Sequence, residues 1–184
     1  IVLNQALAFG GRPPHFVEVG GGTGCVSISL LLMSPSATAH VYEASPEASR
    51  YLSENAQAHG VSDRLIQYNC DFYSGQGQAS FADICLKGKN GEINLALFVS
   101  NPPYITPQDM ETLEPEVANY EPDIALRGTD ADGLGFYRGF ASSISALAPV
   151  DIACLVEVGH LQAEAVSQIF AGAGFTGIYL WPDL

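Results

Sequence analysis

Short apolar runs alternate with longer amphipathic stretches along this chain, and that alternation restricts the fold more than any other feature of the sequence. Buried strands are predicted at residues 15–19, 39–42, 65–69, 93–99, 152–158 and 175–181. Helices are predicted at residues 25–33, 46–58, 134–147 and 162–171. Residues 74–91, rich in Gly, Ser and Gln, are expected to form an exposed connection with at most a short helix. The alternation predicts an α/β fold with a mainly parallel sheet and helices on both faces.

Length and composition suit one domain over residues 1–184. Of these 184 residues, 47% are hydrophobic, which is enough to bury a sizeable core. No run approaches the ~18 to 20 apolar residues that cross a bilayer, and the first residues do not begin a secretory signal. Cys25, Cys70, Cys85 and Cys154 lie far apart in or beside apolar runs, which predicts reduced core thiols. We therefore expect no membrane association and an intracellular location, either cytoplasmic or in an organellar matrix.

The charge balance restricts the partners of this chain. Seven Lys and Arg residues stand against 20 Asp and Glu residues, so the formal net charge is −13. Such a surface repels phosphate backbones, and nucleic acid is therefore a disfavoured partner unless another domain or protein supplies positive charge. None of the histidines has a second ligand at a recognisable spacing, so we expect no metal site. Arg127 and Arg138 could hold a substrate or form internal salt bridges.

Three alternating glycines follow the first predicted strand and lead directly into a helix. They are Gly20, Gly22 and Gly24, and the acidic residue Glu18 precedes them. Glycines permit a tight turn and let a ligand approach the backbone more closely than a Cβ would allow. The spacing differs from the G-x-G-x-x-G of dinucleotide enzymes. It fits a nucleotide-type loop whose ligand lacks a pyrophosphate, with a purely structural turn as the alternative.

Two carboxylates end the next two predicted strands. Glu43 lies 19 residues after Gly24, where nucleotide-binding folds use an acid to accept the ribose hydroxyls. Asp71, followed by Phe72, ends the third strand. Either acid alone would suit a solvated strand end. Together with the glycine loop, they predict one ligand site at the carboxyl edge of the sheet.

The segment Asn101, Pro102, Pro103 and Tyr104 follows the fourth predicted strand. Two consecutive prolines cannot continue a central strand, so the strand ends here. An asparagine amide, a proline carbonyl and an aromatic ring would suit a planar NH₂ group, because the two oxygens can accept both of its hydrogens. A strand stop with a buried tyrosine is the structural alternative.

These motifs together resemble the class I S-adenosylmethionine-dependent methyltransferases that modify amino nitrogens. A longer stretch is similar to the HemK/PrmC family of protein-(glutamine-N5) methyltransferases, which act on peptide chain release factors. It comprises the Glu-Pro-x-x-Ala-Leu segment at the end of residues 113–126, residues 132–138, and Glu157-x-Gly159 with Gln162. The resemblance covers nearly the whole chain.

The resemblance implies a cofactor, a substrate and a set of roles. S-adenosylmethionine is the implied cofactor, and a glutamine in the Gly-Gly-Gln loop of a release factor is the implied methyl acceptor. The implied catalytic residues are Asn101, Pro102, Pro103 and Tyr104. The implied cofactor-binding residues are Glu18, Gly20, Gly22, Gly24, Glu43, Asp71, Phe72 and Asn101. Among these, the glycines would line the methionine portion, Glu43 the ribose, and Asp71 with Phe72 the adenine.

The sequence departs from the family pattern at both ends. The family usually carries an N-terminal helical domain and an Arg-Pro-x-Thr-Glu segment before the first strand, and its sheet continues into a further strand. We therefore expect a Rossmann-like methyltransferase fold that lacks the last strand and the N-terminal helical domain. Three alternatives stay open: a ribosomal-protein glutamine methyltransferase, an adenine-N6 nucleic-acid methyltransferase, and a non-catalytic cofactor-binding domain.

Overall fold

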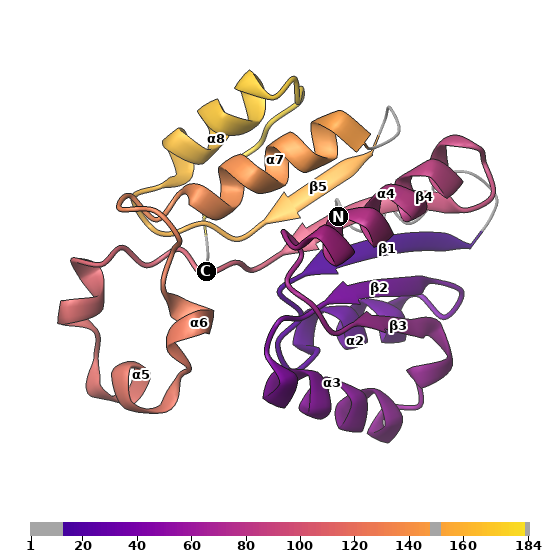
Figure 1. Ribbon diagram of the computed structural model, residues 1–184, viewed down its shortest axis with the longest axis horizontal. Coiled ribbons are helices and arrows are strands. Elements are labelled where there is room, and N and C mark those ends of the chain that lie inside the picture. Colours follow the sequence, from indigo (N-terminus) through magenta and orange to yellow (C-terminus); the bar gives the residue numbers. More distant parts are fainter. Residues whose placement is uncertain (1–12, 148–151, 183–184) are drawn as a thin grey trace. The chain divides into compact units, whose positions relative to one another are not determined.

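The computed structural model describes residues 13–147 and 152–182 (Figure 1). Within these ranges the chain divides into two compact units. The first, here called the sheet unit, contains residues 13–101, 147 and 152–156. The second unit contains residues 102–146 and 157–182. The predicted site residues are divided between the units, because Asn101 belongs to the sheet unit and Pro102 to the second unit.

A five-stranded parallel sheet forms the centre of the sheet unit. Its strand order is β3-β2-β1-β4-β5, and every neighbouring pair is parallel. The order reverses between β1 and β4, because β1 pairs with β2 on one side and with β4 on the other. The strands are β1 (Pro14–Val19), β2 (Thr38–Tyr42), β3 (Leu65–Tyr68), β4 (Asn94–Ser100) and β5 (Ala153–Val156). The first five predicted strands are therefore confirmed, with ends that shift by one or two residues.

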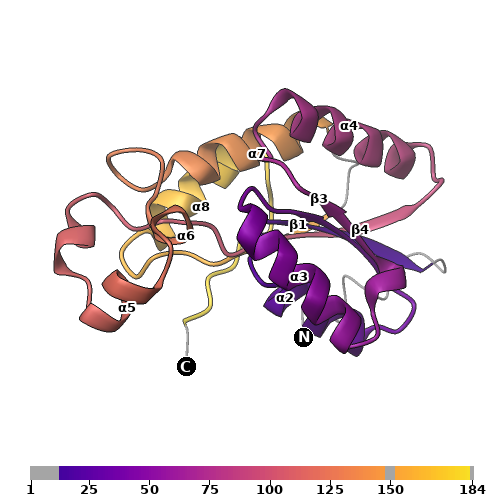
Figure 2. The ribbon, with the colours of Figure 1, turned by 60° about the horizontal axis from the view of Figure 1, so that its bottom comes forward.

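Helices cover both faces of the sheet, as the alternation predicted (Figure 2). The helices α2 (Cys25–Met33) and α3 (Pro46–Ala58) pack on one face, where Leu31 and Leu52 join a core with Phe16 and Leu97. Side chains alternate across a strand, so Phe98 points to the other face. There its ring meets Phe81 of α4 (Gly75–Lys89) at a centroid distance of 5.4 Å.

Helix α4 corrects the prediction of an exposed connection over residues 74–91. The Ser74 hydroxyl caps the helix by accepting from the backbone N–H of Gly77 at 3.1 Å. Phe81, Ile84 and Cys85 are buried at helical spacing. The glycines misled the prediction, because Gly77 serves close packing: a Cβ there would lie 2.4 Å from the carbonyl oxygen of Asp71.

The second unit contains mostly short helices. Residues 106–126 form an excursion that starts and ends at one parallel bridge between Ile105 and Arg127. It carries the turn η2 (Asp109–Thr112) and the helices α5 (Pro115–Tyr120) and α6 (Asp123–Leu126). Two longer helices follow, α7 (Gly135–Leu147, whose last residue belongs to the sheet unit) and α8 (Ala163–Gly172).

The predicted sixth strand at 175–181 is wrong. Residues 175–182 form no strand in the structure. The apolar run there pairs with no strand among the described residues, and Trp181 is 60% exposed while its ring stacks on Tyr179. A segment with strand-forming residues becomes a strand only when a neighbouring strand pairs with it.

The cysteine prediction holds in part. All four thiols are free, as expected, and Cys85 is buried. Cys25 is exposed at the first position of α2, so it is not a core thiol. Among the helices of the described residues, none is both long enough and apolar enough to cross a membrane.

Candidate active site

The glycine loop and Asn101 meet where the strand order reverses. Gly20 directly follows β1, and Asn101 directly follows β4. The Ser100 hydroxyl donates to the Val19 carbonyl at 2.6 Å and holds the two strand ends together. A Cβ added to Gly20 would lie 3.8 Å from the Asn101 carbonyl oxygen. This is the position at which open α/β sheets bind ligands.

Backbone hydrogen bonds fix the glycine loop to the neighbouring strand. The N–H groups of Gly20 and Gly21 both donate to the Tyr42 carbonyl at 3.0 Å. Gly22 has φ +55°, a left-handed conformation that side chains rarely adopt, and a Cβ there would meet no atom within 4 Å. The loop is therefore held on its inner side and open at Gly22.

The loop also needs glycine for close packing, at one position that the motif spacing did not single out. A Cβ at Gly21 would lie 2.2 Å from Cγ1 of Val41, and one at Gly24 would lie 2.4 Å from Cδ1 of Leu52. Gly24 was predicted from the spacing, whereas Gly21 was not. The unbroken run of three glycines was the signal for it.

Glu43 bridges the glycine loop and helix α3. Its Oε2 accepts the Gly22 N–H at 2.7 Å, and its Oε1 accepts the Ser45 N–H at 2.7 Å. The residue is 9% exposed. A carboxylate oxygen can accept a second hydrogen bond, so Glu43 can both hold the loop and accept ligand hydroxyls.

Glu18 lies beneath the loop, with its carboxylate turned toward α2. It is 1% exposed, and its Oε2 accepts hydrogen bonds from the hydroxyl of Ser27 and from the Ser27 N–H, the latter at 3.1 Å. Burial raises the pKa of Glu18 to about 8, and the nearby Glu43 adds to the rise. The structure thus places Glu18 as an anchor between β1 and the first turn of α2.

Asp71 and Phe72 lie shortly after the end of β3, at the same edge. Asp71 is exposed, and its Oδ1 accepts the Tyr73 N–H at 2.9 Å. The Phe72 ring is 3% exposed and contacts Tyr42 and Phe81 edge-on. The carboxylate is therefore open to a ligand, whereas the ring belongs to the aromatic core. All eight predicted cofactor-binding residues lie in the sheet unit.

Sequence comparison identifies relatives of this chain among known proteins. No family model matches it. It is 32% identical over 186 residues to a release factor glutamine methyltransferase of Geobacter sulfurreducens, covering 100% of this chain and 58% of the relative. The match in Caulobacter vibrioides, also named release factor glutamine methyltransferase, is 34% identical over 189 residues, covering 100% of this chain and 59% of the relative. The chain is related to the release factor glutamine methyltransferases.

A third relative is much longer. A bifunctional methyltransferase of Rickettsia bellii is 34% identical over 173 residues, covering 94% of this chain and 28% of the relative. The chain thus spans a little over half the length of the two release factor glutamine methyltransferases, and less than a third of the bifunctional protein.

Solved structures confirm the fold. A precorrin-6y C5,15-methyltransferase from Geobacter metallireducens has a TM-score of 0.55 at 9% identity, covering 94% of this chain and 69% of that one. A SAM-dependent methyltransferase from Agrobacterium tumefaciens also has a TM-score of 0.55, at 13% identity, covering 94% of this chain and 47% of that one. The chain has the Rossmann-like fold of class I methyltransferases.

The Asn-Pro-Pro-Tyr segment crosses from one unit into the other. Asn101 is the exposed last residue of this stretch of the sheet unit, and Pro102 begins the second unit. Within the second unit the Tyr104 hydroxyl donates to Glu157 Oε1 at 3.2 Å, and the Tyr104 carbonyl accepts from the Gln162 amide at 2.9 Å. Gln162 was noted in the sequence only as part of the family resemblance, without a role.

Both arginines of the second unit form internal salt bridges. Arg127 pairs with Asp123 at 2.9 Å, and Arg138 pairs with Asp130 at 2.8 Å and with Asp132 at 2.5 Å. The salt-bridge alternative is thus the one the structure favours.

The described residues contain no group of three His, Cys, Asp or Glu side chains that could hold a metal ion. His15 and His40, 25 residues apart in the sequence, lie 3.1 Å apart between ring nitrogens. Burial lowers the pKa of both, to about 4 for His40, so this pair is neutral at pH 7.

Proposed function

We propose that this chain methylates the N5 nitrogen of a glutamine side chain in a protein, with S-adenosylmethionine as the methyl donor. The release factor glutamine methyltransferases that it resembles over its whole length support the activity. The observation that carries the proposal is the meeting of Gly20 and Asn101 at the reversal of strand order. On this proposal, residues 1–184 belong to one catalytic domain.

The cofactor would extend along the carboxyl edge of β1, β2 and β3. Its methionine portion would lie over Gly20 and Gly22, because a Cβ at Gly22 would meet no atom of the described residues within 4 Å. The ribose hydroxyls would donate to Glu43, and the adenine amino group would donate to Asp71. Glu18 and Phe72 would not contact the cofactor themselves. Glu18 would hold the glycine loop in place through Ser27, and Phe72 would hold the segment after β3 in place through Tyr42.

Positioning is the main catalytic requirement for an amide nucleophile. The nitrogen lone pair of glutamine is delocalised into the carbonyl group, so the nitrogen attacks poorly without alignment. We propose that the Asn101 side-chain oxygen and the Pro102 carbonyl accept its two N–H bonds and aim the lone pair at the sulfonium methyl. Alignment of this kind can lower a barrier by up to ~7 to 11 kcal/mol.

The atoms of the transfer balance without a metal or a further reactant. The new bond joins the methyl carbon to the amide nitrogen while the carbon–sulfur bond breaks and its electron pair stays on sulfur. The nitrogen then loses one proton to solvent. Fixed oxygen acceptors at Asn101 and Pro102 stabilise the positive charge that develops on nitrogen before that proton leaves.

The substrate is proposed to be the Gly-Gly-Gln loop of a peptide chain release factor. A slender, glycine-rich loop can carry a glutamine amide to the strand ends, and a net charge of −13 favours a basic protein partner over nucleic acid. A glutamine of a ribosomal protein offers the same chemistry, so it is the second candidate.

Methyl transfer from labelled S-adenosylmethionine tests the proposal. The full-length protein is incubated separately with release factor, with ribosomal proteins, with DNA and with RNA, and peptide mass spectrometry locates the label. We expect the label on the release factor glutamine, and none on a release factor in which that glutamine is changed to glutamate. Label on adenine at a comparable rate, in physiological salt, would contradict the proposal.

A further inference from the structure

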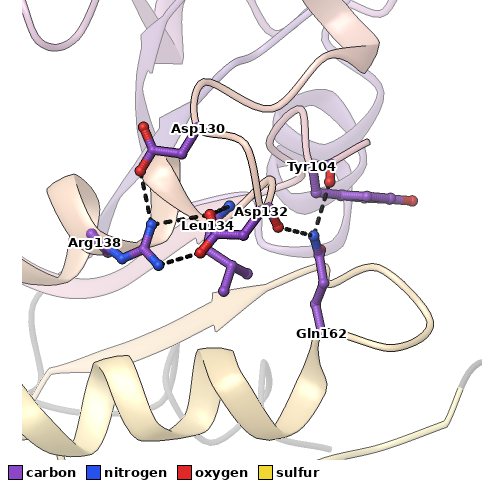
Figure 3. Close-up of polar contacts among 6 residues, drawn as sticks. All are labelled: Tyr104, Asp130, Asp132, Leu134, Arg138 and Gln162. Atoms are coloured by element: carbon purple, nitrogen blue, oxygen red, sulfur yellow. Dashed lines mark hydrogen bonds and ion pairs between the residues drawn. The ribbon is translucent and has the colours of Figure 1, made fainter. Parts of the chain in front are cut away.

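We propose that Gln162 is a positioning residue for methyl transfer, acting through the backbone of Tyr104 on the Pro102 carbonyl. This inference rests on the proposed function, because it assigns a role in holding the methyl acceptor. Gln162 lies at the N-terminus of α8, far in sequence from the Asn-Pro-Pro-Tyr segment. Its side-chain amide nevertheless donates a hydrogen bond to the Tyr104 carbonyl (Figure 3).

Every polar atom of the Gln162 side chain has a partner in the second unit. Its Nε2 donates to the Tyr104 carbonyl at 2.9 Å and to the Asp132 carbonyl at 3.2 Å. Its Oε1 accepts the Gly159 N–H at 3.3 Å. One amide thus joins three separate backbone segments, and both a donor and an acceptor are needed to do so.

Two glycines make room for this amide. A Cβ at Gly133, where φ is +71°, would lie 2.3 Å from the Tyr104 carbonyl oxygen and 2.7 Å from Gln162 Nε2. A Cβ at Gly159 would lie 2.6 Å from Gln162 Oε1. The backbone therefore encloses the glutamine amide closely, and little displacement of the Tyr104 carbonyl is possible while Gln162 is in place.

Asp132 is itself held by Arg138, which gives the amide a fixed second partner. Arg138 donates to the carboxylate of Asp130 and to that of Asp132. Asp132 Oδ1 also accepts the Leu134 N–H at 3.0 Å (Figure 3). The Arg138 guanidinium, with that N–H, holds the pKa of Asp132 at about 2. The Asp132 carboxylate therefore stays charged at neutral pH and keeps its pairing with Arg138.

The position of Tyr104 bears directly on the acceptor clamp. By this we mean the Asn101 side-chain oxygen and the Pro102 carbonyl, which are proposed to hold the substrate amide. The Pro103 ring fixes φ of Pro103, which is one of the torsions between the Pro102 and Tyr104 carbonyls, so a movement of Tyr104 is passed back toward Pro102. On the other side, Ile105 donates to the Leu126 carbonyl at 2.9 Å and closes the excursion. Releasing the Tyr104 carbonyl would therefore turn the Pro102 carbonyl away from the substrate amide, and a shift of 1 Å can cost ~10²-fold in rate.

Three variants of the full-length protein test this role. Gln162→Leu removes both hydrogen-bonding groups, whereas Gln162→Glu keeps an acceptor and becomes a donor only when protonated. Gln67→Leu is the matched control, because Gln67 also donates to a backbone carbonyl, that of Ser49 at 2.9 Å, but lies in β3 of the sheet unit. For each variant we would measure kcat, the KM for release factor, the Kd for S-adenosylmethionine, and thermal unfolding.

We expect kcat to fall by about 10²-fold in Gln162→Leu, with the cofactor Kd within a few-fold of wild type. Gln67→Leu should keep the wild-type kcat. In Gln162→Glu, the ratio of kcat to the wild-type kcat should rise as pH falls, because only the protonated carboxyl can donate to the Tyr104 carbonyl. In Gln162→Leu the same ratio should stay flat with pH, since leucine cannot be rescued by a proton.

The outcomes separate this inference from the proposed function. If the wild-type protein methylates no glutamine, the proposed function fails. If it does, and folded Gln162→Leu turns over normally, the positioning role is overturned. A Gln162→Glu ratio that does not change with pH also overturns it. Loss of cooperative unfolding in both Gln162 variants would make the residue structural and would likewise overturn the role.

Discussion

At the scale of single residues, Asn101 is proposed to act on the chemical step rather than on cofactor binding. It directly follows β4 beside Gly20, and its side-chain oxygen is proposed to hold the nucleophile rather than the sulfonium. Asn101→Ala should therefore lower kcat by ~10²-fold or more, the scale expected when one preorganised polar contact is lost. The Kd for S-adenosylmethionine, measured by calorimetry, should stay within a few-fold. A defect confined to cofactor binding would show that Asn101 does not hold the methyl acceptor.

Asn101→Asp is the sharper variant at the same position. It keeps an acceptor oxygen and adds a negative charge, so the geometry of the clamp is tested separately from its charge. We expect cofactor affinity close to that of Asn101→Ala. If Asn101→Asp turns over faster than Asn101→Ala, the side-chain oxygen contributes more to the rate than the NH₂ group that both variants lack.

Glu43 should matter mainly for cofactor affinity. Losing a hydrogen bond to a charged acceptor costs ~1.5 to 3 kcal/mol, so Glu43→Ala should raise the Kd for S-adenosylmethionine by roughly 10- to 100-fold. Glu47→Ala, an exposed position in the first turn of α3, is the matched control and should leave the Kd unchanged. Thermal unfolding of Glu43→Ala should be recorded in parallel, because Glu43 also holds the Gly22 and Ser45 N–H groups.

Glu18 should make stability depend on pH. Its pKa is raised from 4.5 to about 8 in the folded protein, so between these values the folded state binds a proton that the unfolded state has lost. The free energy of unfolding should therefore decrease as pH rises through this window. Glu18→Gln, which stays neutral, should flatten that decrease in urea titrations at several pH values. An unchanged slope would mean that another group is responsible.

The sequence predicted which residues would gather at the site, but not how each side chain would face. Polar residues at the ends of parallel strands must meet at one edge, so Glu43, Asp71 and Asn101 could be placed without a structure. The inward turn of Glu18 toward Ser27 and the burial of the Phe72 ring depend on packing that spacing does not encode. The same is true of Gln162, whose contacts cross 58 residues of sequence.

At the scale of elements, α4 shows the limit of composition as a guide. Its glycines suggested a loop, yet a capped and amphipathic helix forms because Phe81, Ile84 and Cys85 bury one face. Residues 175–181 show the reverse, since an apolar run that was predicted as a strand forms none where it pairs with no described strand. Local pattern was sufficient where the neighbouring strands were themselves predicted, as in β1 to β5.

Two glycines of α4 should respond in opposite directions to the same substitution. A Cβ at Gly77 would lie 2.4 Å from the Asp71 carbonyl oxygen, so Gly77→Ala should lower the free energy of unfolding by ~1 to 3 kcal/mol. Gly75 has nothing within 4 Å of its Cβ position, so Gly75→Ala should raise that free energy by up to ~1 kcal/mol. Urea denaturation of both variants checks the pair. Equal effects would mean that helix propensity, rather than packing, decides.

At the scale of the whole molecule, the charge of −13 should govern encounter with the substrate. Added salt screens long-range attraction, so KM for a basic release factor should rise between low and physiological ionic strength while kcat stays constant. A short uncharged peptide containing Gly-Gly-Gln is the control, and its KM should change little. A KM for the whole release factor that ignores salt would argue against electrostatic steering.

The pairing of β1 with β4 has a consequence for the order in which the molecule can be built. β1 can pair with β2 early, because β2 follows soon after it in the chain. The hydroxyl that joins β4 to β1 belongs to Ser100, which lies 81 positions after Val19. Contacts that distant in sequence form slowly, and a growing chain keeps one edge of β1 unpaired until β4 has been synthesised. The proposed site at that edge cannot form in a shorter nascent chain, so ligand binding there would report that the central strands have come together.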